Sequence, residues 1–237
     1  MIEIKICGIT NKEDALTACE AGADAVGFIF YPQSPRYILP EQAKKIIQAL
    51  PPEICRVGVF VNLDLLNLNE ISTFCNLDLI QLHGDESTDY CRKLPASRLI
   101  KSLSPVNEQD VDRAEDYPTK AILVDSRTHS KYGGTGQTVD WNLAAKMKSK
   151  RPLILAGGLK AENVAVAIAA VGPDALDFCS GVESMPRQKD PEKIRSVIEI
   201  VRRSSPASGG EQIKIFTRTE IAVEKDEQKT IGAAERK

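Results

Sequence analysis

The most restrictive feature of this chain is a regular alternation between short apolar stretches and longer amphipathic stretches. Short apolar runs bounded by turn residues are typical of buried parallel strands, and amphipathic stretches between them are typical of crossover helices. The predicted strands are residues 2–7, 25–30, 56–61, 77–82, 99–103, 121–125, 153–156 and 176–179. The predicted helices are residues 12–21, 40–50, 64–74, 87–94, 108–116, 139–148, 161–171 and 191–202.

This count of units predicts an α/β fold, a single-domain (β/α)8 TIM barrel over residues 1–203. The units average roughly 25 residues, which a closed eight-stranded barrel accommodates. An open doubly wound sheet is the rival, but it usually has fewer strands and a dinucleotide fingerprint at its first turn. The first turn here reads Cys7-Gly8-Ile9-Thr10 and has no such fingerprint, so the closed barrel is preferred.

A change of composition follows the predicted barrel. Residues 204–210 are rich in serine, glycine and proline, as linkers are. Residues 204–237 are therefore predicted to be a linker-like, flexible C-terminal tail, and no function is assigned to them. A short alternating stretch at 212–219 leaves an added edge strand or hairpin open.

Charge and cysteine usage exclude several classes of partner. The net charge of -2 and the pI of about 5.9 give no basic footprint for nucleic acid. No apolar run approaches the roughly 20 residues that span a bilayer, so no membrane partner is expected. The N-terminus alternates charged and apolar residues, unlike a signal peptide, and a cytoplasmic location is expected. The six cysteines form no C-x-x-C pair and there are two histidines, so no metal site is expected.

In barrels of this kind, ligands bind at the carboxyl ends of the strands. The loops after the last two strands contain Gly157, Gly158, Ser180 and Gly181. Glycine lets backbone N–H groups approach an anion closely, which favours a phosphate site, although two tight turns are the alternative. A further glycine cluster at 133–136 is either a mobile lid or a flexible connection.

Four other side chains lie at predicted strand ends or in the loops after them. Asp125 and Cys7 are a candidate general acid and base, although a loop cap and a core cysteine are the alternatives. As a base, Cys7 would act as a thiolate, which requires a pKa below the usual value of about 8.5. Arg36 lies in a loop with two prolines and suits a planar carboxylate, but from the residues alone a solvated surface arginine is favoured. His83 either lines the pocket or is structural.

Several motifs, taken in order, resemble one family, phosphoribosylanthranilate isomerase of tryptophan biosynthesis. The resemblance covers residues 2–203 in one collinear run. The motifs are KICGIT at 5–10, AVGFIF at 25–30, SPRYI at 34–38, VGVFVN at 57–62, QLHG at 81–84, GGTG at 133–136, DW at 140–141, AGGL at 156–159 and SGVE at 180–183. Any one of them could occur by chance, but the whole ordered set is specific.

The resemblance implies an Amadori rearrangement of N-(5-phosphoribosyl)anthranilate to 1-(2-carboxyphenylamino)-1-deoxyribulose 5-phosphate, without cofactor or metal. It implies that Asp125 protonates the ribose ring oxygen and that Cys7 removes the C2 proton of the resulting Schiff base. It also implies that Arg36 holds the anthranilate carboxylate. The remaining implied substrate-binding residues are His83, Gly157, Gly158, Asp177, Ser180 and Gly181. The only partner expected is a small phosphorylated substrate, and the protein is expected to be a monomer or homodimer.

Two classes of alternative fit the residues less well. Indole-glycerol-phosphate synthase relies on lysines at strand ends, and no lysine ends the first, fourth or sixth predicted strand here. The histidine-pathway sugar isomerase resembles this family but has aspartate where Cys7 stands. A non-catalytic phospho-ligand-binding barrel would need neither Cys7 nor Asp125. The one clear departure from the family pattern is Arg187, which replaces a glycine and puts the geometry of its loop in question.

Overall fold

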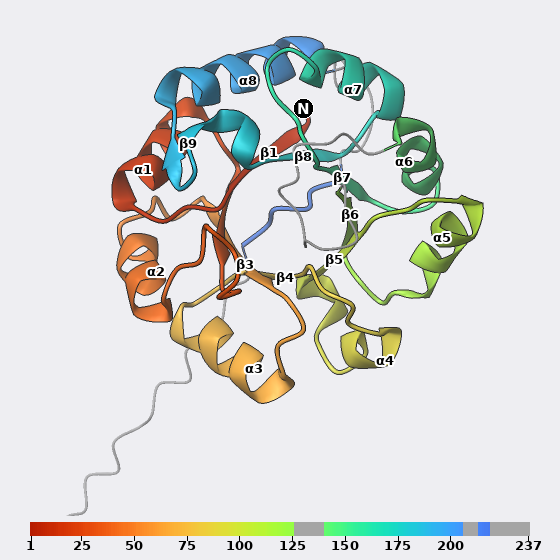
Figure 1. Ribbon diagram of the computed structural model, residues 1–237, viewed down its shortest axis with the longest axis horizontal. Helices are drawn as coiled ribbons and strands as arrows, with labels where there is room; N and C mark the ends of the chain where they lie inside the picture. The colour runs from red at the N-terminus through yellow and green to blue at the C-terminus, as the bar shows by residue number, and fades with distance from the viewer. Residues whose placement is uncertain (126–139, 206–212, 219–237) are drawn as a thin grey trace, which may run out of the picture.

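The computed structural model describes residues 1–125, 140–205 and 213–218, and its centre is a closed barrel of eight parallel strands in sequential order (Figure 1). Pairing of the first strand with the last, with Lys5 opposite Asp177, closes the barrel. The predicted TIM barrel is thereby confirmed. The strands are β1 (Glu3–Cys7), β2 (Ala25–Ile29), β3 (Cys55–Phe60), β4 (Leu79–Leu82), β5 (Leu99–Leu103), β6 (Ala121–Val124), β7 (Leu153–Leu155) and β8 (Ala175–Phe178).

Helices surround the barrel as an outer ring (Figure 1). They are α1 (Lys12–Ala21), α2 (Pro40–Ile47), α3 (Leu65–Phe74), α4 (Thr88–Cys91), α5 (Glu108–Arg113), α6 (Trp141–Lys148), α7 (Val164–Val171) and α8 (Pro191–Ser204). Three short 3-10 helices are η1 (Ala96–Arg98), η2 (Ala114–Asp116) and η3 (Ser180–Val182). Helix α7 begins three residues later than predicted because the Asn163 side chain donates to the Gly158 carbonyl (2.9 Å) and holds the preceding turn.

The strands divide the core into two faces, because successive side chains of a strand point to opposite sides. On β1, Ile4 and Ile6 pack outward against the core shared with the helices. Glu3, Lys5 and Cys7 therefore point into the barrel, and the alternation of charged and apolar residues at the N-terminus reflects these two faces. A separate apolar cluster fills the interior: Ala25, Cys55, Val57, Leu79, Ile100, Ala121, Leu123, Ile154, Ala156, Ala175, Ile215 and Phe216.

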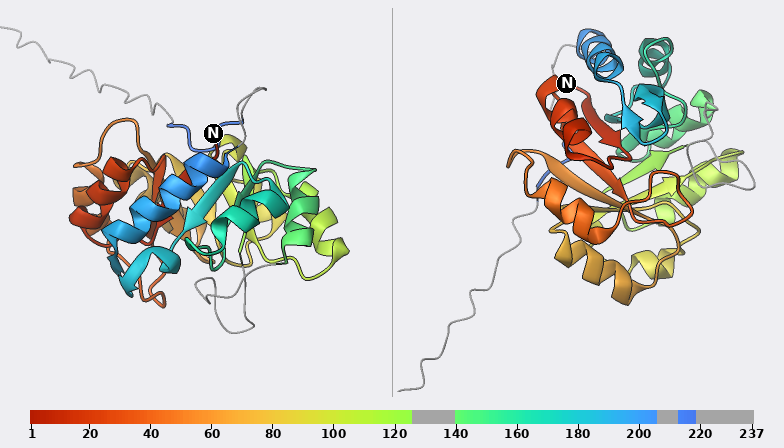
Figure 2. Two further views of the ribbon diagram at one scale, coloured as in Figure 1. Left: turned by 90° about the horizontal axis from the view of Figure 1, so that it is seen from above. Right: turned by 60° about the vertical axis from the view of Figure 1, so that its left-hand side comes forward.

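Residues 213–218 close the amino-terminal end of the barrel. Figure 2 shows this blue segment at the same end of the barrel as the N-terminus. Ile215 and Phe216 are buried, and Glu3 accepts hydrogen bonds from both backbone N–H groups, at 2.5 Å from Ile215. Burial raises the pKa of Glu3 although these hydrogen bonds oppose the shift. The flexible tail was predicted over residues 204–237. Within it, residues 213–218 are held against the barrel, and residues 206–212 and 219–237 lie outside the described residues.

We expect Phe216→Ala to lower the free energy of unfolding by about 3 kcal/mol, because it removes a buried ring from the base of the barrel. Urea unfolding followed by circular dichroism measures the change. Ile213→Ala is the control, since Ile213 belongs to the same segment but is 47% exposed. Equal midpoints for the two variants would show that the segment does not stabilise the barrel.

A small hairpin precedes α8, which the sequence did not predict. It consists of β9 (Glu183–Met185) and β10 (Gln188–Lys189), with Arg187 between the two strands. Arg187 has φ 76°, in the left-handed region that glycine enters without steric cost. Arg187 therefore keeps a backbone conformation that favours glycine at this turn, at the expense of local strain.

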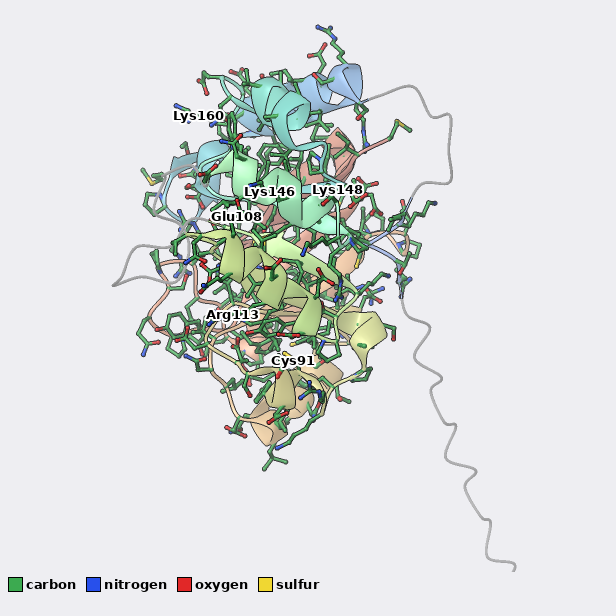
Figure 3. All side chains as sticks on the ribbon, turned by 90° about the vertical axis from the view of Figure 1, so that its right-hand side faces the viewer. Cys91, Glu108, Arg113, Lys146, Lys148 and Lys160 are labelled. Atoms are coloured by element: carbon green, nitrogen blue, oxygen red, sulfur yellow. The ribbon has the colours of Figure 1, made fainter. Side chains whose placement is uncertain are left out.

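Ion pairs connect neighbouring helices on the outer surface. Figure 3 labels Glu108 of α5 and Lys146 of α6, which form one of these pairs. Both side chains are more than half exposed, so the pair contributes little to stability. Among the helices of residues 1–125, 140–205 and 213–218, none is long and apolar enough to cross a membrane.

Candidate active site

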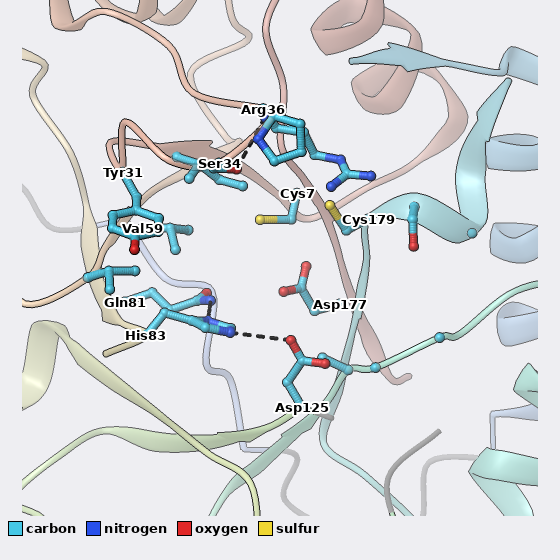
Figure 4. Close-up of a pocket in the computed structure, with 18 of the residues that line it drawn as sticks. Cys7, Tyr31, Ser34, Arg36, Val59, Gln81, His83, Asp125, Asp177 and Cys179 are labelled. Carbon is cyan, nitrogen blue, oxygen red and sulfur yellow. Dashed lines mark hydrogen bonds and ion pairs between the residues drawn. The ribbon is translucent and has the colours of Figure 1, made fainter. Parts of the chain in front are cut away.

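A pocket of about 670 Å³ opens at the carboxyl ends of the strands. Side chains and loops from seven of the eight strands reach it, and Figure 4 shows its polar groups facing one another. All nine residues predicted from the sequence line this pocket: Cys7, Arg36, His83, Asp125, Gly157, Gly158, Asp177, Ser180 and Gly181. The structure thus brings together residues that are up to 174 positions apart, while their individual roles stay predictions.

Cys7 lies beside a buried ion pair. Lys5, two residues earlier on the same face of β1, donates to Asp177 Oδ2 at 2.8 Å, and Lys5 is fully buried. Burial lowers the pKa of Lys5, but the charges of Asp177 and Cys7 and the hydrogen bonds to them outweigh it, so the net shift is upward. Lys5 is therefore an ammonium ion that stabilises negative charge on the Cys7 sulfur.

The other oxygen of Asp177 has no hydrogen-bond partner among the described residues. Asp177 is 7% exposed and its carboxylate points into the pocket in Figure 4. Burial raises the pKa of Asp177, although Lys5 opposes this shift. A buried acceptor without a partner is costly, so Oδ1 is suited to accept a hydrogen bond from a ligand.

A second thiol, Cys179, follows β8 and also lines the pocket. Its hydrogen bond with Cys7, together with burial, raises the pKa of Cys7 well above the usual value, although Lys5 opposes this. The same hydrogen bond and the nearby Lys189 and Arg36 lower the pKa of Cys179 to about 6. The lowered pKa that a thiolate base requires is thus found at Cys179, and the two thiols titrate as a pair.

His83 and Asp125 face each other across the pocket. His83 Nε2 lies 3.3 Å from Asp125 Oδ2, and Gln81 Nε2 lies 3.0 Å from His83 Nδ1 (Figure 4). With Gln81 Nε2 as the donor to Nδ1, a neutral His83 ring carries its proton on Nε2, directed at Asp125. Gln81 therefore fixes the tautomer of His83 that stabilises a carboxylate at position 125.

The loop that carries His83 is held by a buried charge network. Lys101 donates to Glu86 Oε2 at 3.0 Å and to the Gly84 carbonyl at 2.8 Å. Glu86 in turn accepts from the backbone N–H of Gly84 at 3.0 Å. Because both charged groups are almost fully buried and paired, the network restrains the backbone on which the imidazole is mounted.

Arg36 is held by two carboxylate oxygens rather than lying free. Its Nε and Nη2 donate to Glu183 at 2.7 and 2.6 Å, and Lys189 donates to the same carboxylate at 3.0 Å. Burial raises the pKa of Glu183, but these two cations outweigh it and the net shift is downward. Glu183 occupies Nε and Nη2, so Nη1 is the guanidinium nitrogen that remains to meet an anionic ligand.

The two glycine loops pack against each other. Gly157 and Gly158 have φ 82° and 63°, which glycine adopts without strain. A Cβ atom on Gly181 would lie 1.9 Å from the Leu159 carbonyl oxygen, so no other residue fits there without moving the loop. This close approach brings the backbones that follow β7 and β8 to one side of the pocket.

Four residues of this site were not predicted from the sequence: Lys5, Gln81, Cys179 and Glu183. Three of them could have been predicted, because residues two positions apart on a strand point to the same face. Each lies two positions from a predicted site residue on the same strand face: Lys5 from Cys7, Gln81 from His83, and Cys179 from Asp177. Glu183 has no such signal, because its contact with Arg36 depends on how two distant loops meet.

Two other expectations concern what the site contains. Within the described parts of the chain, no group of three or more histidine, cysteine, aspartate or glutamate side chains could hold a metal ion. The glycine cluster at 133–136, considered as a lid, lies outside the described residues.

Residues 4–200 match the family described as N-(5'phosphoribosyl)anthranilate (PRA) isomerase. The N-(5'-phosphoribosyl)anthranilate isomerase of Syntrophus aciditrophicus is 51% identical over 227 residues, covering 93% of this chain and 99% of that protein. The enzyme of the same name from Thermotoga maritima is 47% identical over 201 residues, covering 84% of this chain and 98% of that protein.

Solved structures give the same result. The crystal structure of phosphoribosyl anthranilate isomerase from Thermotoga maritima has a TM-score of 0.78 and 44% identity, covering 86% of this chain and all of that chain. A phosphoribosyl anthranilate isomerase in complex with reduced 1-(o-carboxyphenylamino)-1-deoxyribulose 5-phosphate has a TM-score of 0.75 and 42% identity, with the same coverage.

Proposed function

Because this chain belongs to the N-(5'-phosphoribosyl)anthranilate isomerase family, we propose how the residues of its pocket divide the work of that isomerisation. The protein is an isomerase of tryptophan biosynthesis that converts N-(5'-phosphoribosyl)anthranilate to 1-(2-carboxyphenylamino)-1-deoxyribulose 5-phosphate. The observation that carries the division of roles is the meeting of an acid, Asp125, and a thiol, Cys7, in one pocket.

Substrate binding uses the two ends of the pocket. The backbone N–H groups of the Gly157–Gly158 and Ser180–Gly181 loops bind the phosphate, which their glycines allow to approach closely. Arg36 binds the anthranilate carboxylate through Nη1, while Glu183 fixes the plane of the guanidinium. Asp177 Oδ1 accepts a hydrogen bond from a sugar hydroxyl, which supplies the partner that this oxygen lacks.

Ring opening is catalysed by Asp125. Its carboxyl group gives a proton to the ribose ring oxygen as the C1–O bond breaks, and a Schiff base forms between C1 and the anthranilate nitrogen. The carboxylate that remains accepts a hydrogen bond from His83 Nε2, which lies 3.3 Å away. Gln81 supports this step because it holds the tautomer that donates.

Cys7 then removes the C2 proton of the Schiff base, and the resulting enol-amine tautomerises to the ketone. Cys7 and Cys179 share one proton near neutral pH, because the pKa of Cys179 is lowered to about 6. The ammonium of Lys5 favours the state in which Cys7 carries the negative charge. The base therefore forms when the proton on Cys7 passes to its neighbour.

The test of this function is the loss of substrate fluorescence when purified protein meets phosphoribosylanthranilate that is generated in situ. Rapid loss, with formation of the ketose phosphate, is expected of the isomerase. A barrel that only binds a phospho-ligand would bind a phosphate-containing product analogue but would leave the fluorescence unchanged, and this outcome would contradict the proposal.

We expect Arg36→Lys to lower kcat/KM about 10- to 100-fold, mainly through a higher KM. Lysine keeps the charge beside Glu183 but lacks the fork that serves Glu183 and a ligand carboxylate together, and a charged hydrogen bond contributes about 1.5–3 kcal/mol. Steady-state kinetics measures the effect, with the exposed Arg113→Lys on α5 as the control. An unchanged KM would remove Arg36 from carboxylate binding.

We also propose that the protein acts in the cytoplasm as a monomer or homodimer. One solved relative, the enzyme from Thermotoga maritima, is described as dimeric and has been converted to monomers. The catalytic groups assigned above all belong to one chain, so either state provides a complete set.

A further inference from the structure

The pocket holds two thiols on neighbouring strands, while the isomerisation needs only one sulfur to take the C2 proton. Cys7 ends β1 and Cys179 follows β8, and both line the pocket. Ile6 pairs with Phe178 in the parallel register, so Cys7 and Cys179 come one step later on adjacent strands. Ile6 and Phe178 face the outer core, and the next residue of each chain therefore faces inward.

This placement suits a disulfide. Adjacent strands lie about 4.8 Å apart, and a disulfide needs Cα atoms about 4.4–6.8 Å apart. The Cys179 sulfur also lies against the end of β1, since a Cβ atom on Gly8 would be 3.2 Å from it. Figure 4 shows both side chains at the same wall of the pocket, between Arg36 and Asp177. The Cys7 sulfur lies on the side of β2, where a Cβ atom on Gly27 would be 2.8 Å from it, so the disulfide forms after the Cys7 side chain rotates toward β8.

The chain contains six free thiols, and their environments differ in one respect. Burial raises the pKa values of Cys19, Cys75 and Cys91 to about 11 and also raises that of Cys55. Cys179 alone has a lowered pKa, because Cys7, Lys189 and Arg36 stabilise its thiolate. Since the thiolate is the reactive form, an oxidant that enters the pocket is directed to Cys179.

We propose that Cys179 is an oxidation site, and that hydrogen peroxide converts Cys7 and Cys179 to a disulfide that reversibly inactivates the enzyme. The Cys179 thiolate attacks peroxide, a sulfur–oxygen bond forms as the oxygen–oxygen bond breaks, and hydroxide leaves. The Cys7 sulfur then attacks the sulfenic acid, the disulfide forms and water leaves. In total two thiols and one peroxide give one disulfide and two waters. The loss of activity rests on the proposed role of Cys7 as the base.

The experiment treats the full-length enzyme with peroxide and follows activity and peptide mass together. Trypsin cuts after Lys5, Lys12, Lys160 and Arg187, so the disulfide joins peptide 6–12 to peptide 161–187. We expect this linked pair to appear as activity falls, by about 10²–10⁴-fold when all molecules are oxidised. Dithiothreitol should remove the linked pair and restore the rate.

Two variants sharpen the test. Cys179→Ser should form no linked pair and should keep its own untreated rate at the peroxide dose that inactivates the parent. Cys19→Ser, which changes a thiol on α1 outside the pocket, should behave like the parent. Inactivation of Cys179→Ser as fast and as reversibly as the parent would overturn the proposal.

The peptide readout separates this inference from the proposed function. An active enzyme that loses its rate without forming the linked pair would refute the oxidation site alone. A linked pair that leaves the rate unchanged would refute inactivation and would also remove Cys7 as the base. An untreated enzyme without isomerase activity would refute the proposed function, while the linked pair would still report on the thiol chemistry.

Discussion

Replacing Asp125 by asparagine is expected to lower kcat by about 10²–10⁴-fold while KM changes little, which is the range for loss of a positioned acid. The amide is nearly the same size and can still accept a hydrogen bond from His83, 3.3 Å away in the parent. It cannot give up a proton to the ring oxygen. The loss should therefore fall on the chemical step rather than on substrate binding.

Steady-state assays of Asp125→Asn measure both constants, and product-analogue binding measures the integrity of the pocket. Asp89→Asn is a matched control, since Asp89 on α4 makes the same chemical change at an exposed site. Near-normal turnover by the Asp125 variant would mean that another group, or solvent, protonates the ring oxygen. His83 would then be the first candidate, because it faces the same part of the pocket.

Replacing Cys7 by alanine is expected to lower kcat by a similar factor, about 10²–10⁴-fold, with substrate affinity retained. The side chain is small and 4% exposed, so its removal creates only a minor cavity. Cys7→Ser should be equally slow although it fills the space, because a hydroxyl is a far weaker base than a thiolate. Agreement between the two variants would assign the loss to proton transfer rather than to packing.

Cys19→Ala serves as the control for the Cys7 variants, since it removes a partly buried thiol of α1 that lies outside the pocket. Thermal unfolding of each variant shows whether the barrel is intact. If Cys7→Ala retained most of its turnover, the base would have to be the neighbouring Cys179, whose pKa is already lowered to about 6. The double variant would then be inactive.

The barrel could be predicted from the sequence because each strand and helix has its own local sequence pattern. Alternation of period two marks a strand, and an amphipathic stretch with a cap such as Asn11 marks the helix that follows. Eight repeats of this unit leave few other ways to bury the apolar faces. The rule that ligands bind at the carboxyl ends of the strands then placed residues such as Cys7, Asp125 and Gly157 on one rim.

Which side chains contact one another in the site depends on the closure of the barrel, and the sequence did not predict these pairs. Lys5 and Asp177 are 172 positions apart, and they meet only because β1 lies beside β8. The same closure brings Cys179 to Cys7. Arg36 looked like a free ligand for a carboxylate, yet the structure pairs two of its nitrogens with Glu183, at 2.7 and 2.6 Å. Local sequence periodicity does not predict which distant side chain will pair with a buried charge.

The sequence by itself thus determined the class of fold, the rim on which the site lies and the residue types available there. Tertiary structure decided which charges surround the two thiols, which atoms face His83 and what closes the base of the barrel. The segment around Phe216 follows a stretch of linker composition, yet Glu3 and the apolar interior hold it in place. The physical reason is that hydrophobic periodicity shows which face of a helix or strand is buried. The pKa values and the buried contacts instead depend on residues that are close in space but distant in sequence.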